Sequence, residues 1–255
     1  MKSNLFSLAG RVALITGSAQ GLGKAMAEGL AQCGAHVVLN GRSQARLSET
    51  GKELESKGMS VSIATFDVAD YDAAKRAIED IEKAQGSLDI LINNVGYRNR
   101  RGIFDFQPGD MDRMLNINLT APFELSRLAV RGMLQRKWGR IINVSSVVSQ
   151  IAGPGDATYV AAKGGLESLT RALASEFGKD GITVNAISPG FFETEPNAHL
   201  VQDRALLSWL SDRTALGRWA KPDEIRGAAI FLASDAASYV TGHVLAIDGG
   251  MLAHL

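Results

Sequence analysis

One rhythm repeats along the whole chain: a short apolar run rich in β-branched residues, a Gly or Asn turn, and then a stretch with helical spacing. The apolar runs are nearly continuous, which is typical of strands that are covered on both faces. The helical stretches GKAMAEGLAQCG (23–34) and GGLESLTRALASEFGKDG (164–181) each end in a glycine, Gly34 and Gly181, suited to a helix C-cap. Alternating strands and helices predict an α/β fold with a parallel, doubly wound sheet of about seven strands and helices on both faces. The predicted strands are VALIT (12–16), HVVLN (36–40), VSIATFDV (61–68), LDILINN (88–94), RIINVSS (140–146), ITVNAISPG (182–190) and VLAIDGG (244–250).

The sequence shows no linker, low-complexity segment or composition shift that would divide its 255 residues. We therefore expect a single domain over residues 1–255, with a longer insertion at roughly 191–220 that serves as a substrate loop. In a doubly wound sheet, ligands bind beyond the carboxyl ends of the strands. The segments that follow the predicted strands are thus the place to search for chemistry.

Composition excludes several function classes. The chain has 27 basic and 27 acidic residues, and this balance argues against a nucleic-acid binder, which usually carries a basic surplus. No apolar run approaches the roughly 20 residues of a membrane span, and the N-terminus lacks the apolar core of a signal peptide. With one cysteine, Cys33, and four histidines without metal-ligand spacing, neither a disulfide nor a metal site is expected. These features predict a soluble, metal-free cytoplasmic protein.

The segment TGSAQGLG (16–23) lies between the first predicted strand and the first helix. Its three glycines, Gly17, Gly21 and Gly23, would let the backbone turn tightly and approach a pyrophosphate, while the helix N-terminus offers unpaired N–H groups to the anion. The glycines could instead serve only close packing of helix on strand. Their position between a strand and a helix favours a nucleotide site.

The end of the second strand, NGR (40–42), bears on the choice of nucleotide. An acid near this point usually binds the ribose hydroxyls of NAD, but here Asn40 replaces it and Arg42 follows two residues later. Without the acid a 2′-phosphate is not repelled, and an arginine can bind it through charge-assisted hydrogen bonds. NADP(H) is therefore favoured over NAD(H), unless Arg42 is simply a solvated turn residue. Asp67 could accept from the adenine amino group or could be the N-cap of the next helix.

Ser146, Tyr159 and Lys163 form the most informative combination. In YVAAK (159–163) the tyrosine and lysine lie four residues apart, on one face of a helix, and Ser146 ends a strand at the same rim. A lysine ammonium at about 4 Å contributes about 4 kcal/mol at an effective dielectric of 20, which would lower a tyrosine pKa by up to about three units. Tyr159 could then act as a general acid and base, and Ser146 could hold the substrate oxygen beside it.

With these motifs, the chain resembles the short-chain dehydrogenase/reductase family over essentially its whole length. The segments TGSAQGLG, NNVG, NIN, VSS, YVAAK, SPG and VTG…DGG stand in the family's order and spacing. The resemblance implies a single Rossmann-type domain, hydride transfer between a nicotinamide and a carbonyl or alcohol, and a homotetramer or otherwise a dimer. The subunits would pack through helices near 111–136 and 157–179.

The resemblance also assigns roles to residues. Tyr159 would be the acid/base, Ser146 would orient the substrate, and Lys163 would bond the nicotinamide ribose and lower the tyrosine pKa. Asn118 would position a water in a proton relay, and Thr194 would bond the nicotinamide carboxamide. Two positions depart from the family pattern: Val95 replaces an alanine, and Gln20 stands where many NADP-dependent members have a basic residue. The cofactor-binding set expected on these grounds is Gly17, Ser18, Gln20, Gly21, Leu22, Gly23, Asn40, Arg42, Asp67, Val68, Asn94, Gly96, Tyr159, Lys163, Pro189, Gly190 and Thr194.

Within the family, several segments resemble those of gluconate 5-dehydrogenases, among them VVLNGR, NLTAPFELSR, FFETEPNAHLVQD and LGRWAKPDEI. This favours a sugar acid or another small polar hydroxy or keto compound as substrate. The alternative is a 3-oxoacyl-[acyl-carrier-protein] reductase, against which Asp180 argues because such enzymes often carry a basic residue just before this strand. A non-catalytic nucleotide sensor is a more remote alternative, because such proteins usually lose the tyrosine or the lysine, and this chain keeps both.

The segment NNVGYRNRRGIF (93–104) places three arginines after the fourth strand, at the mouth of the expected site. In the bland hypothesis the arginines are solvated, or pair with Asp105 and Asp110 or with another subunit. The sharper hypothesis is that Arg100 or Arg101 binds the carboxylate of a sugar acid, with Gln150 as a further substrate contact.

Overall fold

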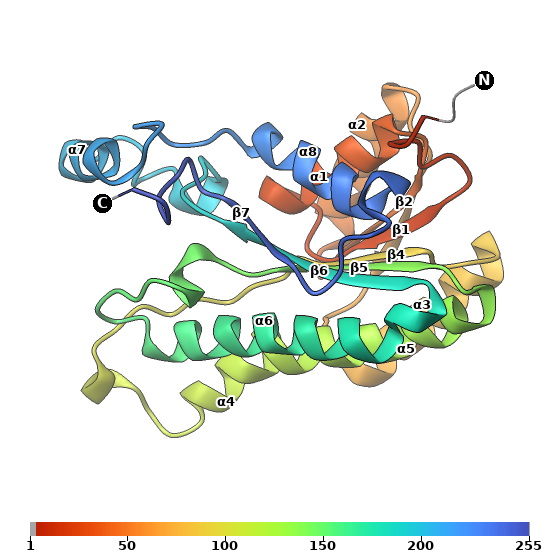
Figure 1. Cartoon of the computed structure of the whole chain (residues 1–255), viewed down its shortest axis with the longest axis horizontal. Helices are drawn as coiled ribbons and strands as arrows, with labels where there is room; N and C mark the ends of the chain where they lie inside the picture. Colours follow the sequence, from red (N-terminus) through yellow and green to blue (C-terminus); the bar gives the residue numbers. More distant parts are fainter. Residues whose placement is uncertain (1–3, 255) are drawn as a thin grey trace.

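In a computed structural model that describes residues 4–254, seven strands form one parallel sheet in the order β3-β2-β1-β4-β5-β6-β7 (Figure 1). The order reverses between β1 and β4, which makes the sheet doubly wound and confirms the predicted Rossmann-type fold. Each predicted apolar run overlaps one strand, and most strands are shorter than the runs. The strands are β1 (Val12–Ile15), β2 (His36–Gly41), β3 (Val61–Thr65), β4 (Ile90–Asn93), β5 (Gly139–Val144), β6 (Ile182–Pro189) and β7 (Val244–Ile247).

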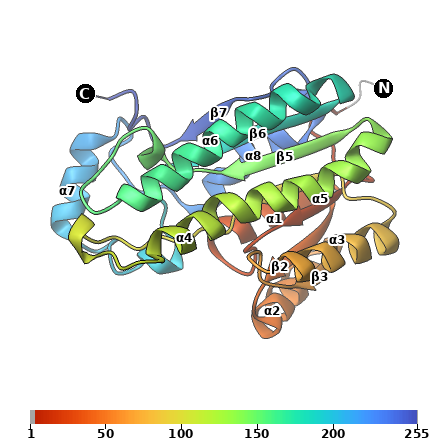
Figure 2. The same cartoon turned by 90° about the horizontal axis from the view of Figure 1, so that it is seen from below.

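Helices cover both faces of the sheet. Helices α1 and α8 pack together on one face, and α3, α5 and α6 lie on the other (Figures 1 and 2). Short helices α4 and α7 lie at one end of the molecule, beyond the carboxyl ends of the strands (Figures 1 and 2). The helices are α1 (Gly21–Gln32), α2 (Gln44–Ser56), α3 (Tyr71–Gln85), α4 (Asp110–Leu115), α5 (Ala121–Arg136), α6 (Ala157–Phe177), α7 (Arg204–Arg213) and α8 (Arg226–Ala233).

Strand β1 shows why the apolar runs are continuous. Ala13 and Ile15 enter the core beneath α1 and α8, whereas Val12 and Leu14 enter the core beneath α3, α5 and α6. All four side chains are buried. Full burial of a large aliphatic side chain contributes about 1.5–3 kcal/mol, so a polar residue on either face would be costly. The strand sequence therefore shows no alternation of polar and apolar residues.

Glycine and aspartate set the helix ends. Gly34 (φ 97°) and Gly181 (φ 78°) adopt the left-handed conformation just after α1 and after the short 3₁₀ extension of α6, as predicted. The N-cap of α3 is Asp70, whose carboxylate accepts from the backbone N–H of Ala73. The alternative role of Asp67 as this cap is therefore wrong. Asp67 caps the preceding turn by accepting from the N–H of Ala69.

None of the helices in the described part of the chain has both the length and the apolar character needed to cross a membrane. Among residues 4–254 there is also no group of three or more His, Cys, Asp or Glu side chains arranged to hold a metal ion.

Candidate active site

The loops after β1 and β4 are joined by a network of hydrogen bonds. The Thr16 hydroxyl accepts from the backbone N–H groups of Asn94 (2.8 Å) and Val95 (3.1 Å). In return, the Asn94 side-chain amide donates to the carbonyls of Thr16 (2.8 Å) and Gly17 (3.2 Å). The glycine-rich turn is thus held by Asn94, so in this structure the Asn94 side chain shapes the rim.

The glycine-rich turn has the shape that a pyrophosphate requires. Gly17 (φ 64°) and Gly21 (φ 57°) are left-handed, a conformation that favours glycine. A Cβ on Gly23 would lie 2.3 Å from the Gly17 carbonyl oxygen and 2.6 Å from the Asn94 amide nitrogen, so only glycine fits there. Gln20, the N-cap of α1, makes no side-chain cap bond, which leaves the first-turn N–H groups of α1 directed at this turn. These residues fit a dinucleotide phosphate.

Val95 and Gln20, the two departures from the family pattern, are both accommodated. The Val95 methyl group packs over Gly17, at 3.0 Å from the position of a Cβ there, so the missing side chain of Gly17 makes room for it. Gln20 accepts a hydrogen bond from Arg46 (2.8 Å), which brings a basic side chain to the turn from α2. The sequence alone did not single out Arg46.

At the end of β2, Asn40 and Arg42 have different environments. Asn40 has no exposed surface, and its amide donates to the carbonyls of Ala64 (3.0 Å) and Phe66 (3.1 Å). The Asn40 side chain therefore shapes the rim and presents no atom to a ligand, which changes the role expected for it. The side chain of Arg42 is 80% exposed and has only a weak ion pair, at 3.9 Å, with Asp67. Arg42 is thus available to an anion at the rim.

Other residues of the expected cofactor set surround this turn. The Ser18 hydroxyl donates to the Ile15 carbonyl (2.8 Å), and the side chains of Leu22 and Val68 pack in the two cores. Ser18 and Val68 are buried and could contact a cofactor only through their backbones, whereas Leu22 is half-buried. Thr194 lies over Gly21, with its methyl group 3.7 Å from where a Cβ would be, and Gly190 approaches Asp248 closely after Pro189 at the end of β6. The loops after β1 and β6 therefore lie against each other at this rim.

Ser146, Tyr159 and Lys163 meet at the carboxyl end of β5. The Ser146 hydroxyl lies near enough to Tyr159 to lower the pKa of its phenol, and the Lys163 ammonium lies 5.8 Å from the centroid of the Tyr159 ring. Lys163 is 2% exposed and its Nζ donates to the Val144 carbonyl (2.8 Å). A Cβ on Gly96 would lie 3.7 Å from the same Nζ, so the β4 loop borders this lysine. The structure brings together all three residues that the sequence indicated.

The pKa values in this cluster differ from the expectation. Burial raises the pKa of Tyr159, and the Arg98 charge and the Ser146 hydroxyl lower it in part. Burial also lowers the pKa of Lys163, to about 8. The prediction that Lys163 depresses the tyrosine pKa is therefore not met by this geometry, because the lysine is directed at the Val144 carbonyl and is itself desolvated.

Asn118 lies in a feature that the sequence did not predict. The helix expected near 111–136 is interrupted by a π-helical turn, Asn116–Thr120, between α4 and α5. The buried Asn118 amide donates to the Tyr97 carbonyl (2.8 Å), and its oxygen accepts from the Tyr97 N–H (3.1 Å). Asn118 therefore positions the backbone after β4, and wide turns of this kind are frequent at functional sites.

The three arginines after β4 have distinct partners. Arg98 forms a two-bond ion pair with the buried Asp156 (2.8 and 2.6 Å). Arg101 donates to Asp110 (3.1 Å) and to the Asp105 carbonyl (3.2 Å), as the bland hypothesis expected. Arg100 uses only Nε, toward the Pro154 carbonyl (3.2 Å), and its side chain is 61% exposed. In the described residues, neither terminal nitrogen of Arg100 has a hydrogen-bond partner, whereas Arg98 and Arg101 each use one terminal nitrogen to bind a carboxylate.

Sequence reasoning also missed the buried carboxylate behind the Ser146 loop. Glu167, one turn after Lys163 on α6, accepts hydrogen bonds from the hydroxyls of Ser145 (2.8 Å) and Ser149. These bonds hold the loop on both sides of Ser146. The exposed Gln150 follows in the same loop. The only sequence signal was a charged residue at a helical position expected to face the sheet.

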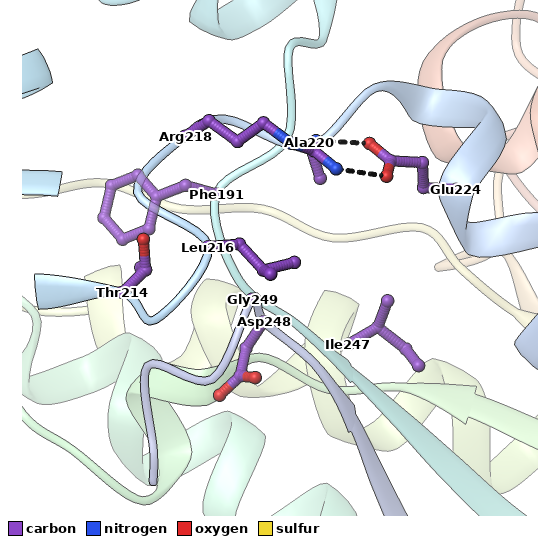
Figure 3. Close-up of a pocket in the computed structure, with 9 residues that line it drawn as sticks. All are labelled: Phe191, Thr214, Leu216, Arg218, Ala220, Glu224, Ile247, Asp248 and Gly249. Carbon is purple, nitrogen blue, oxygen red and sulfur yellow. Dashed lines mark hydrogen bonds and ion pairs between the residues drawn. The ribbon is translucent and has the colours of Figure 1, made fainter. Parts of the chain in front are cut away.

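The 191–220 segment folds over the site and carries its own small core. Phe191 packs against Trp209 (5.5 Å between centroids) and Trp219 (5.3 Å), and this cluster includes Val147, which follows Ser146. A cavity of about 160 Å³ lies between this segment and the end of β7 (Figure 3). Across it, Arg218 binds Glu224 through two bonds of 2.8 Å, and this arginine holds the pKa of Glu224 at about 2 (Figure 3). None of the residues in that lining is Ser146, Tyr159 or Lys163, so the cavity supports the loop and is not the reaction centre.

Comparisons with known proteins agree with this geometry. A family model described as Enoyl-(Acyl carrier protein) reductase matches residues 17–252. The chain is 42% identical over 252 residues to gluconate 5-dehydrogenase of Gluconobacter oxydans (strain 621H), covering 99% of this chain and 98% of that protein. It is 38% identical over 245 residues to a 3-oxoacyl-[acyl-carrier-protein] reductase of Thermotoga maritima, covering 96% of this chain and 99% of that protein.

A solved structure is similarly close. The crystal structure of a gluconate 5-dehydrogenase from Burkholderia cenocepacia J2315 in complex with NADP and tartrate aligns with a TM-score of 0.95 and 40% identity, covering 99% of both chains. The full-length matches, the doubly wound sheet and the meeting of Ser146, Tyr159 and Lys163 at its rim agree with one another. The chain belongs to the short-chain dehydrogenase/reductase family.

Proposed function

We propose that the protein is an NADP(H)-dependent oxidoreductase that interconverts a secondary alcohol and a ketone on a sugar acid, as a gluconate 5-dehydrogenase does. The observation that carries the proposal is the convergence of Ser146, Tyr159 and Lys163 beside the glycine-rich cradle. The gluconate 5-dehydrogenase relatives, one of them crystallised with NADP and tartrate, support the substrate class and the cofactor.

Each residue of the site has a defined task in this reaction. When bound, the nicotinamide supplies or accepts the hydride. In ketone reduction, Tyr159 Oη donates its proton to the substrate oxygen, while the Ser146 hydroxyl holds that oxygen in place. Lys163 would turn from the Val144 carbonyl to the nicotinamide ribose, and Thr194 would contact the carboxamide. Asn118 fixes the loop after β4, which borders Lys163.

The pyrophosphate of the cofactor would bind beside Gly17, Gly21 and Gly23, and Arg42 would bind the 2′-phosphate of the adenosine. Arg42 suits this role because it is exposed and only weakly paired. Arg46 reaches the same turn through Gln20 and adds positive charge. Asn40 contributes by holding the rim rather than by touching the cofactor.

Replacing Arg42 with alanine is expected to raise the KM for NADPH about tenfold and to change the KM for NADH less than twofold. The loss corresponds to one charge-assisted contact, reduced because the side chain is largely exposed to solvent. Steady-state kinetics with both nicotinamides measure the effect. Equal changes for the two cofactors would contradict the assignment of Arg42 to the phosphate.

Within the substrate site, Arg100 would bind the carboxylate and Gln150 a hydroxyl of the sugar acid. Arg100 has two terminal nitrogens available and a side chain exposed at the mouth. Arg101 is removed from this role because Asp110 and the Asp105 carbonyl already hold it.

Replacing Arg100 with alanine should raise the KM for 5-keto-gluconate about tenfold, because one charge-assisted hydrogen-bonded contact is lost. The KM for neutral polyols and ketoses should not change. Arg101→Ala is the matched control, because it removes an arginine of the same loop that is bound to a protein carboxylate. A uniform effect of Arg100→Ala on the KM of charged and neutral substrates would show that Arg100 does not bind the substrate carboxylate.

The function itself is tested by a steady-state panel of 5-keto-gluconate, other keto sugar acids, polyols and acetoacetyl esters, each with NADPH and NADH. The panel separates the proposal from a 3-oxoacyl-[acyl-carrier-protein] reductase, the alternative favoured by the similarity to the Thermotoga maritima enzyme. Cofactor binding without turnover on any compound would favour the nucleotide sensor.

We also propose that residues 1–255 act as one catalytic domain in a cytoplasmic homotetramer, with 191–220 as the substrate loop. The exposed apolar side chains of Met111, Phe123 and Leu134 on α4 and α5 support an interface on these helices. Light scattering coupled to gel filtration measures the subunit number, and a monomer would contradict this proposal.

A further inference from the structure

Arg98 lies beside Tyr159 but has no role in the proposed reaction as described so far. Its guanidinium carbon lies 5.3 Å from the centroid of the Tyr159 ring, slightly closer than the Lys163 ammonium at 5.8 Å. The arginine comes from the loop after β4, whereas the tyrosine and the lysine come from α6. Two cations from different elements thus lie at similar distances from the tyrosine that exchanges the proton.

Asp156 fixes this arginine in place. Its carboxylate is 1% exposed and accepts from Nε (2.8 Å) and Nη2 (2.6 Å) of Arg98. Asp156 precedes α6 directly, where the helix dipole favours a negative charge. A two-bond pair with a buried carboxylate fixes both the place and the plane of a guanidinium, so Arg98 is preorganised before any ligand arrives.

Besides Arg98, the charged and polar side chains that the described structure places beside Tyr159 are Lys163, Asp156 and Ser146. Burial and the Asp156 charge oppose ionisation of the phenol, but that charge is shared by Arg98 and, at 3.5 Å, by Arg100. Lys163 is directed at the Val144 carbonyl, and burial brings its pKa to about 8. Lys163 therefore loses its charge as the pH rises, whereas an arginine keeps its charge throughout the accessible range.

We propose that Arg98, anchored by Asp156, is a positioning residue of the proton-transfer step that acts through Tyr159 by stabilising its phenolate. In ketone reduction the O–H bond of Tyr159 breaks, its proton forms the O–H bond of the product alcohol, and the electron pair remains on the phenolate oxygen. The hydride that reaches the carbonyl carbon comes from the reduced nicotinamide. This inference rests on the proposed function only in taking Tyr159 as the acid and base.

The test is the pH dependence of Tyr159 ionisation in Arg98→Gln. The rise of kcat/KM for alcohol oxidation should have its midpoint about one pH unit higher than in the native enzyme, since a neighbouring charge at this distance shifts a pKa by one to three units and the Asp156 carboxylate that opposes ionisation remains. Arg98→Lys, which keeps the charge but not the two-bond anchor, should shift the midpoint less. A variant that lowers the plateau of kcat/KM without moving the midpoint would show a merely structural role and overturn the proposal.

A second readout needs no substrate. The chain has four tyrosines, and subtracting the titration of Tyr159→Phe isolates the tyrosinate absorbance of Tyr159, read in pH jumps before unfolding begins. The midpoint should again be higher in Arg98→Gln than in the native chain. If the substrate panel fails but this midpoint moves, the proposed function is wrong and the Arg98 inference stands. If the midpoint does not move, the inference is wrong whatever the activity.

Arg127 offers a matched control. It also pairs with a carboxylate through two bonds, of 2.8 and 2.6 Å to Glu124, and also lies 5.3 Å from a tyrosine ring, that of Tyr71. This triad lies on α5 and α3, apart from the reaction centre. Arg127→Gln should leave both midpoints of Tyr159 unchanged, and an equal shift there would show that the effect of Arg98→Gln is not local.

Discussion

Replacing Tyr159 with phenylalanine is expected to lower kcat about 10² to 10⁴-fold, the range that a positioned general acid or base contributes. Phenylalanine keeps the ring that lies beside Arg98 and Lys163 but has no proton to give to the substrate oxygen. Steady-state kinetics in both directions measure the loss.

The same variant should bind the cofactor almost normally. Lys163 and the glycine-rich turn remain, so the dissociation constant for NADPH, read by fluorescence quenching, should change less than about threefold, well under the 1.4 kcal/mol of a tenfold change. Tyr97→Phe is the control, because Tyr97 serves Asn118 through its backbone. If Tyr159→Phe retained most of the native kcat, the mechanism proposed for this site would be wrong.

Replacing Gly23 with alanine is expected to raise the NADPH dissociation constant by about 100-fold, at the upper end of the 1–3 kcal/mol that overpacking costs. The added Cβ would lie 2.3 Å from the Gly17 carbonyl oxygen and 2.6 Å from the Asn94 amide nitrogen. Neither neighbour can move freely, since the first is backbone and the second bonds to Thr16 and Gly17. The turn must therefore open where the phosphates would bind.

A fall of several degrees in Tm should accompany the weaker binding, because the same clash separates the β1 and β4 loops. Gly227→Ala is the matched control, since that glycine lies in α8 and a Cβ there meets no atom within 4 Å. An alanine at this helix position should stabilise the protein by about 0.5–1 kcal/mol. Native cofactor affinity in Gly23→Ala would mean that the turn does not cradle the phosphates.

The fold was predictable because each strand must be apolar on both faces. Val12, Ala13, Leu14 and Ile15 enter two different cores in alternation, so the pattern in the sequence follows directly from burial. The interruption of the helix near 111–136 was not predictable, because nothing in local propensity distinguishes the π-helical turn at Asn118 from ordinary helix. That turn depends on the bonds between Asn118 and the backbone of Tyr97, which follows β4.

The arginine segment after β4 shows where sequence reasoning stops. The sequence placed Arg98, Arg100 and Arg101 at the mouth of the site but could not assign a partner to each. The ion pair of Arg98 with Asp156 joins residues 58 positions apart, and it forms only because the β4 and β5 loops meet at one edge of the sheet. That pair leaves Arg100 available and sets Arg98 beside Tyr159.

The sequence by itself determined the doubly wound sheet, the glycine-rich turn and the identity of Ser146, Tyr159 and Lys163, since spacing and side-chain type are local properties. Only the tertiary structure decided the electrostatics of the site. Burial lowers the pKa of Lys163 and raises that of Tyr159, and desolvation depends on everything packed around a group rather than on its neighbours in sequence. Of the two cations beside the tyrosine ring, the nearer is an arginine from another loop, which no spacing rule along the chain could have indicated.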